Sequence, residues 1–86
     1  MWVRSQDKTT IVNVEMVEIR EWDNTIIGHS FSRVVELGSY STEEKVLKVL
    51  IHLILHINAI EKSKITGTLP RDITNMVFQM PKDDEV

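Results

Sequence analysis

The chain has 86 residues, of which 42% are hydrophobic and 27% are charged, and it contains no cysteine. This length is enough for one domain, and the lack of cysteine excludes disulfides and thiolate chemistry. A net charge of −3 provides no basic surface for phosphate groups, which argues against nucleic-acid binding. The first residues, MWVRSQDK, lack the apolar stretch of a signal peptide, so we expect a cytoplasmic protein.

Residues 2–40 are predicted to form an antiparallel β-meander. They are rich in Val, Ile, Thr and Trp, in short runs separated by turn-forming residues. Two tight turns are predicted, at Asp7–Lys8 and at Asp23–Asn24. In the run VNVEMVEIREW the apolar residues change from one face of the strand to the other. This change predicts a bulge or bend near residues 14–16, because one extra residue reverses the direction of every later side chain.

A long helix is predicted over residues 42–62. It begins with Ser41-Thr42-Glu43-Glu44, which fits a capping box in which Ser41 accepts a hydrogen bond from the backbone N–H of Glu44.

The remaining residues complete an expected α+β fold: four to five antiparallel strands packed with one long helix in a single domain, residues 1–86. Gly67 and Pro70 are typical of a loop. The last elements are predicted as a loop over 63–73, a C-terminal strand over about 75–80, and an acidic tail over 82–86 that we expect to be frayed.

The predicted helix is apolar around most of its circumference, about 240° in total, whereas the usual stripe of a surface helix is much narrower. One stripe of this arc is predicted to pack on the sheet, and it contains Val46, Leu50, Leu53, Ile54 and Ile57. The second shoulder consists of Leu47, Ile51 and Leu55. A small sheet leaves this shoulder uncovered, and two occupants remain open: residues 63–80 of the same chain or a second copy. We predict a two-fold homodimer, because such dimers are the commonest soluble oligomers.

The run KVLKVLIHLILHINAI at residues 45–60 is not predicted to cross a membrane. It contains a lysine, two histidines and an asparagine within its apolar part. That part is about 15 residues long, whereas a spanning helix needs about 20 apolar residues.

Three stretches carry a resemblance to a known family: MWVRSQDK, LGSYSTEEKVLKVL and VFQMPKD. In combination and order, they resemble a family of short proteins from Gram-positive bacteria and their phages and prophages, which has no established function. The resemblance implies an α+β domain in which a helix follows a β-meander and a C-terminal strand closes the fold. It assigns no catalytic residue. The chain departs from the family at Ile51 and Leu55, where polar or acidic residues are expected, and this departure favours self-association.

The candidate chemical sites are incomplete. His52 and His56 have the i, i+4 spacing of a metal-binding pair, but they provide only two ligands and share their side of the helix with lysines, so we predict no metal. His29 with Ser30 and Ser32 has no orienting acid at a recognisable spacing. Three acidic residues recur in one region, Glu15, Glu18 and Glu21. We expect them to be solvated charges that discourage edge-to-edge aggregation of strands.

The sequence therefore predicts a non-catalytic protein-interaction module of phage or prophage type, which needs no cofactor. An alternative is a nucleic-acid accessory protein, which would use the sheet aromatics together with Arg4, Arg20 and Arg33.

Overall fold

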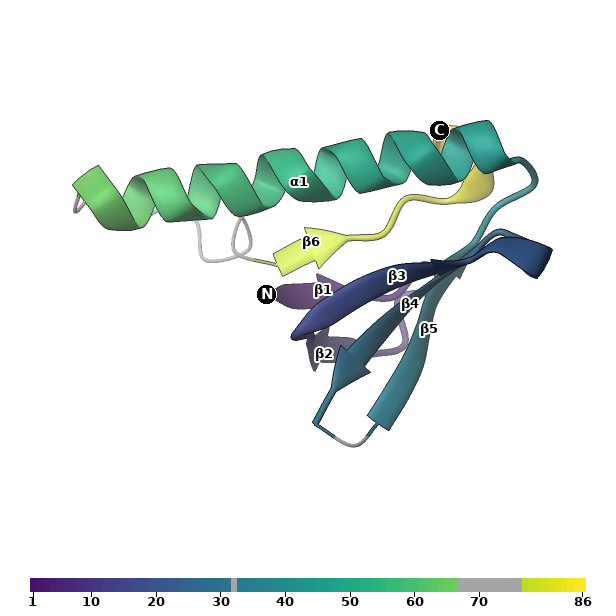
Figure 1. Cartoon of the computed structure of the whole chain (residues 1–86), viewed down its shortest axis with the longest axis horizontal. Coiled ribbons are helices and arrows are strands. Elements are labelled where there is room, and N and C mark those ends of the chain that lie inside the picture. Colours follow the sequence, from purple (N-terminus) through teal and green to yellow (C-terminus); the bar gives the residue numbers. More distant parts are fainter. Residues whose placement is uncertain (32, 67–76) are drawn as a thin grey trace.

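The computed structural model describes residues 1–31 and 33–59 in full, the backbone of residues 60–66, and residues 77–86. Within these residues, six strands and one long helix form an α+β fold (Figure 1), which confirms the predicted fold class. In chain order the elements are β1 (Trp2–Arg4), β2 (Ile11–Asn13), β3 (Met16–Arg20), the 3₁₀ turn η1 (Glu21–Asp23), β4 (Thr25–Ser30), β5 (Arg33–Ser39), α1 (Glu43–Thr66), β6 (Val77–Gln79) and the 3₁₀ turn η3 (Asp83–Glu85).

The strands are arranged in two three-stranded sheets rather than in one continuous meander. One sheet has the order β2-β1-β6 and the other has the order β3-β4-β5. Every pair is antiparallel except β1 with β6, which is parallel and differs from the expectation. A parallel pair needs a long crossover connection, and the chain between these two strands includes all of α1. In Figure 1, β6 lies between α1 and β1.

The predicted irregularity near residues 14–16 is the point where the chain passes from one sheet to the other. The backbone N–H of Val14 donates to the carbonyl oxygen of Met1 at 2.8 Å, beside β1. The next N–H, from Glu15, donates to the carbonyl oxygen of His29 in β4, also at 2.8 Å. Two successive amides thus bond to different sheets, which explains why the apolar residues change face there.

The core lies between the two sheets and α1. Val3 of β1, Ile26 of β4 and Met80, just after β6, have no exposed surface. A β-bulge between Ile26 and Ile27 leaves Leu37 of β5 without a paired residue, and its side chain is buried in the same cluster.

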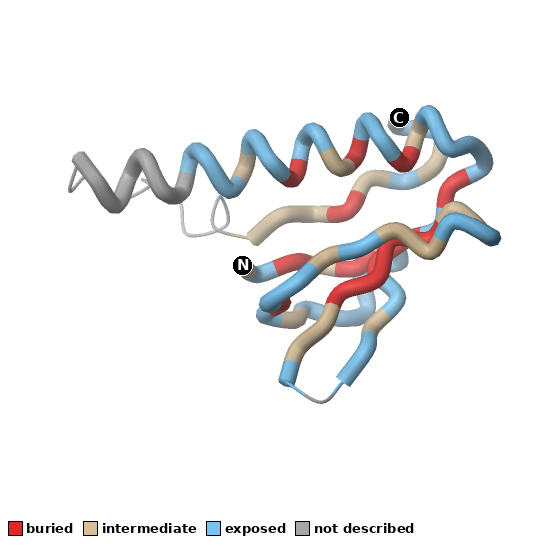
Figure 2. Tube along the Cα trace, viewed as in Figure 1, coloured by how far each residue is buried: buried red, intermediate tan, exposed pale blue. Residues whose placement is uncertain are grey.

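The helix buries only part of the predicted stripe, in which Leu50 is half-buried against the core cluster. Val46, Val49 and Leu53 are buried, and Figure 2 shows that the buried positions of α1 recur on the side facing β6. Ile54 and Ile57 were expected in the core, but they are exposed. The apolar arc is so wide that its centre does not identify the buried face, and the packed face is rotated toward Val49.

The cap at the start of α1 differs from the prediction by one residue. The Oγ1 of Thr42 accepts a hydrogen bond from the backbone N–H of Lys45 at 3.2 Å, and the Thr42 carbonyl accepts the next one from Val46. Thr42 is therefore the N-cap. Ser41, the predicted cap, donates its backbone N–H to Oδ1 of Asp83 at 2.8 Å.

The acidic tail, expected to be frayed, is bonded to the rest of the fold. Asp83–Glu85 form the turn η3, and the carbonyl oxygen of Asp83 accepts a hydrogen bond from Nζ of Lys45 at 2.8 Å. Just before the turn, the hydroxyl of Tyr40 donates to the carbonyl oxygen of Pro81 at 2.8 Å. These contacts join residues about 40 positions apart, which a local reading of the charged sequence does not detect.

Candidate functional site

The side of α1 that faces away from the core carries a continuous apolar surface, which we call the outer helix face. It consists of four aliphatic side chains with exposed fractions of 49%, 56%, 56% and 59%, respectively: Leu47, Ile51, Ile54 and Leu55. The three residues of the predicted shoulder all lie on it. Ile54 extends it, and the sequence prediction missed this residue because it assigned Ile54 to the core stripe. Ile57 is 40% exposed, but it follows the buried Leu53 by one helical turn and lies on the core side of the helix.

Residues 63–80 were one candidate for covering the outer helix face. Their described part after α1, residues 77–80, packs on the opposite side of the helix. The rings of His56 and Phe78 meet edge-to-face, with 5.5 Å between their centroids, and Met80 is buried in the core. Residues 67–76 lie outside the described part of the chain. Strand β6 therefore covers the buried side of the helix and not the outer helix face.

The two helix histidines have different surroundings. His52 is exposed, whereas His56 is half-buried against Phe78. Within residues 1–31, 33–59 and 77–86, no three His, Asp or Glu side chains gather in an arrangement that could hold a metal ion.

An acid that the sequence did not assign pairs with His29. The Nε2 of His29 lies 2.6 Å from Oε1 of Glu18, on the adjacent strand β3. In the β3–β4 register, Met16 is opposite His29 and Glu18 is opposite Ile27, so the pair is a diagonal neighbour on one sheet face. This contact depends on the strand register, which spacing along the chain does not reveal. The adjacent Ser30 points to the other face because strand side chains alternate, so it does not complete a triad with Glu18 and His29. Ser32, the other serine of this prediction, lies outside the described residues.

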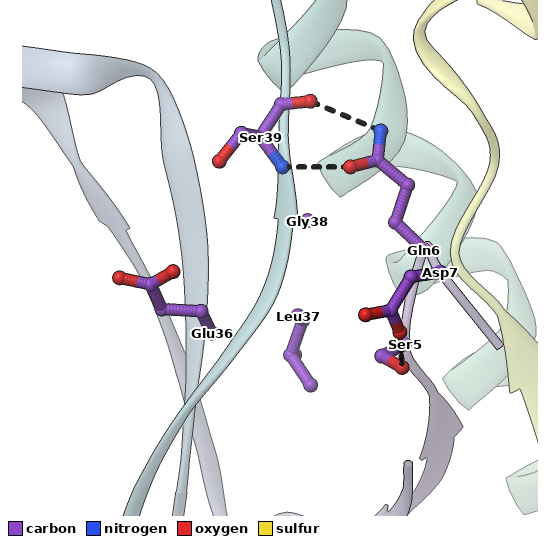
Figure 3. A pocket seen from close by; sticks show the side chains of 7 residues that line it. All are labelled: Ser5, Gln6, Asp7, Glu36, Leu37, Gly38 and Ser39. Atoms are coloured by element: carbon purple, nitrogen blue, oxygen red, sulfur yellow. Dashed lines mark hydrogen bonds between the residues drawn. The ribbon is translucent and has the colours of Figure 1, made fainter. Parts of the chain in front are cut away.

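A small polar pocket of about 140 Å³ lies between the β1–β2 turn and β5 (Figure 3). The side-chain amide of Gln6 donates to the carbonyl of Ser39 and accepts from its N–H, both at 3.0 Å. Asp7 accepts hydrogen bonds from the hydroxyls of Ser5 and Thr9, each at 2.7 Å. These polar groups join the two sheets and hold the turn, so we assign the pocket a structural role.

The hydrogen bonds around Asp7 also set its ionisation. The Ser5 hydroxyl, followed by the hydroxyl and backbone N–H of Thr9, lowers the pKa of this carboxyl group from 3.8 to about 2. The carboxylate is therefore the stable form at all but strongly acidic pH.

The proposed nucleic-acid residues are dispersed. Arg4 lies in the β2-β1-β6 sheet, while Arg20 and Arg33 lie at opposite ends of the other sheet, opposite Thr25 and Ser30 respectively. Arg20 is already paired with two carboxylates, of Asp23 at 2.6 Å and of Glu36 at 2.7 Å. These arginines do not form one basic stripe of the kind that follows a phosphate backbone.

Comparison with protein-family models, curated proteins and solved structures gave no match for this chain. The resemblance to the short proteins of Gram-positive bacteria and their phages therefore stays a prediction. In the described part of the chain, no helix is long and apolar enough to cross a membrane. The fold and the outer helix face define the class as a small α+β protein with an apolar helix surface that the described residues leave exposed.

Proposed function

We propose that this chain is a non-catalytic protein-interaction module and that its first partner is a second copy of itself. The outer helix face carries the proposal, because exposed apolar patches in small proteins commonly mark contact surfaces. The sequence resemblance adds a phage or prophage setting to the same proposal, and the cytoplasmic location expected from the sequence is part of it.

The geometry of the outer helix face favours self-pairing. Leu47, Ile51 and Leu55 follow one another at intervals of four residues and form one ridge along α1. Such a ridge packs into the groove beside the same ridge of another helix, at a crossing angle of about −50°. In a two-fold dimer the same surface serves both partners, so one ridge is sufficient for both sides of the interface.

The charges at the start of α1 favour an antiparallel arrangement. Glu43 and Glu44 occupy its first turn. In a parallel pair these carboxylates would meet those of the other copy, whereas an antiparallel pair separates them by most of the helix length. Lys48, 3.7 Å from Glu44, borders the same ridge. The dimer is expected to associate through its aliphatic side chains, with little contribution from ion pairs.

The experiment combines Ile51→Glu with Leu55→Lys and measures mass by analytical ultracentrifugation over a wide range of concentrations. With increasing concentration the parent should sediment increasingly as a dimer. The variant should sediment as a monomer, and its circular dichroism should show that it is still folded. The matched control is Met16→Glu with Val34→Lys, which places the same charges on two exposed apolar residues of the β3-β4-β5 sheet and should keep the dimer.

Two results would contradict the proposal. A parent that remains monomeric at millimolar concentration has no self-association surface. An Ile51→Glu, Leu55→Lys variant that unfolds at concentrations where the parent is a folded monomer would mean that its own chain covers the outer helix face.

A further inference from the structure

We infer a second binding site at Trp22, which we call the Trp22 platform: an indole that receives an arginine or lysine side chain from a basic segment of a protein partner. The platform lies in η1, between β3 and β4, and it is separate from the outer helix face of α1. Trp22 is 80% exposed. Tryptophan is one of the residue types enriched among the side chains that contribute most of the binding energy in protein interfaces.

The backbone around Trp22 is anchored at the end of the turn. Asn24 adopts a left-handed conformation with φ of 51° and ends η1. The carbonyl oxygen of Asn24 accepts a hydrogen bond from the backbone N–H of Tyr40 at 3.0 Å. This bond ties the turn to the segment that joins β5 to α1, so Trp22 is exposed on a well-anchored turn.

One face of the indole is occupied by Arg20. Its guanidinium lies 4.7 Å from the centre of the Trp22 ring. The same guanidinium donates two hydrogen bonds to Asp23, at 3.0 and 2.6 Å, and one to Glu36 at 2.7 Å. This contact with a hydrogen-bonded guanidinium restricts the ring before any partner binds, which reduces the conformational entropy lost on binding.

The net charge around the platform is negative, although Arg20 lies against one face of the indole. Arg20 contributes one positive charge, while Asp23, Glu36 and the neighbouring Glu21 contribute three negative charges. The hydrogen bond from Arg20 lowers the pKa of Asp23, so the carboxylate stays charged. The free face of the indole, in this acidic surrounding, suits a cation stacked on the ring. The same charges repel phosphate, which disfavours a nucleic-acid strand at this position.

The test uses the two indole N–H resonances of the protein, from Trp2 and Trp22, in ¹H–¹⁵N spectra. The probe is the peptide acetyl-Gly-Arg-Gly-Arg-Gly-amide, and its control contains citrulline, the uncharged isostere, in place of arginine. The Trp22 resonance should shift saturably with the arginine peptide and the Trp2 resonance should not. The citrulline peptide should bind about two- to fivefold more weakly or not at all, which is the range of an exposed cation–π contact.

Variants separate the platform from general charge attraction. Glu21→Gln should weaken binding of the arginine peptide, while Glu43→Gln, the same change on exposed α1, should not. Ile51→Glu with Leu55→Lys should leave the response intact, because the platform does not depend on the helix surface. The inference is overturned if the citrulline peptide binds equally well, if both glutamate variants weaken binding equally, or if oligothymidine shifts the Trp22 resonance and the arginine peptide does not.

Discussion

Asp83 closes the N-terminus of α1 from the other end of the chain: its Oδ1 accepts a hydrogen bond from the backbone N–H of Ser41 at 2.8 Å. The Ser41 amide is the largest cause of a lowered pKa for this carboxyl group, with smaller contributions from the Ser41 hydroxyl and Lys45. A carboxylate at this position also interacts favourably with the positive end of the helix dipole.

Asp83→Ala should lower the melting temperature more than Asp84→Ala, which removes an exposed acid of the same tail. Because the folded-state pKa of Asp83 lies below its usual 3.8, the stabilisation is fully present above that pH and is lost as the pH falls through the lower value. Thermal melts at neutral pH and at successively lower pH values should show the difference between the parent and Asp83→Ala narrowing. Equal melting temperatures for the two variants at neutral pH would contradict a bonded tail.

Thr42→Ala should cost about 1 kcal/mol of stability, because it removes the side-chain oxygen that caps the helix. Ser41→Ala should cost less, since the backbone N–H that donates to Asp83 is retained. Urea denaturation of the two variants compares them directly. A larger loss of stability for Ser41→Ala than for Thr42→Ala would instead support the capping box at Ser41 that the sequence predicts.

Local features of the fold followed from the sequence, because they depend on neighbouring residues. Turn-forming Asp23–Asn24 and the capping signal before Glu43 each act over a few positions, and the structure has a turn and a helix start there. The irregularity at Val14 and Glu15 was also predicted correctly, because the apolar residues change from one strand face to the other at this point of the sequence.

Features that depend on distant contacts were missed. The parallel pairing of β6 with β1 and the contact between Glu18 and His29 need the strand register. The buried side of α1 was predicted only in part: Val46 and Leu53 are buried, whereas Ile54 is exposed. Aliphatic residues occur on nearly every side of the helix, and only the position of the sheets decides which of them is covered. The Trp22 platform gave no local signal either, since Glu36 joins it from another strand.

Gly28→Ala should destabilise the fold by about 1–3 kcal/mol, the range for adding a methyl group to a packed core. A Cβ at this position would lie 2.6 Å from Cγ1 of Val14 and 3.1 Å from Cδ1 of Leu37. The double variant Gly28→Ala, Val14→Ala tests this reason, because removing the valine methyls relieves the closest contact. Its loss in urea denaturation should be smaller than the sum of the two single losses. An additive result would mean that the valine is not the obstacle.

Substitutions at two adjacent helix residues can distinguish the packing of α1 in the core from its proposed role in the dimer contact. Leu53 is 2% exposed and Ile54 is 56% exposed. Leu53→Ala should cost about 2–5 kcal/mol of monomer stability because it leaves a cavity in the core. Ile54→Ala should change monomer stability by less than about 0.5 kcal/mol, and it should weaken the dimer by removing part of the outer helix face. Denaturation at low protein concentration measures the first effect, and sedimentation at high concentration measures the second. A large loss of monomer stability for Ile54→Ala would show that Ile54 also packs in the core, as the sequence predicts.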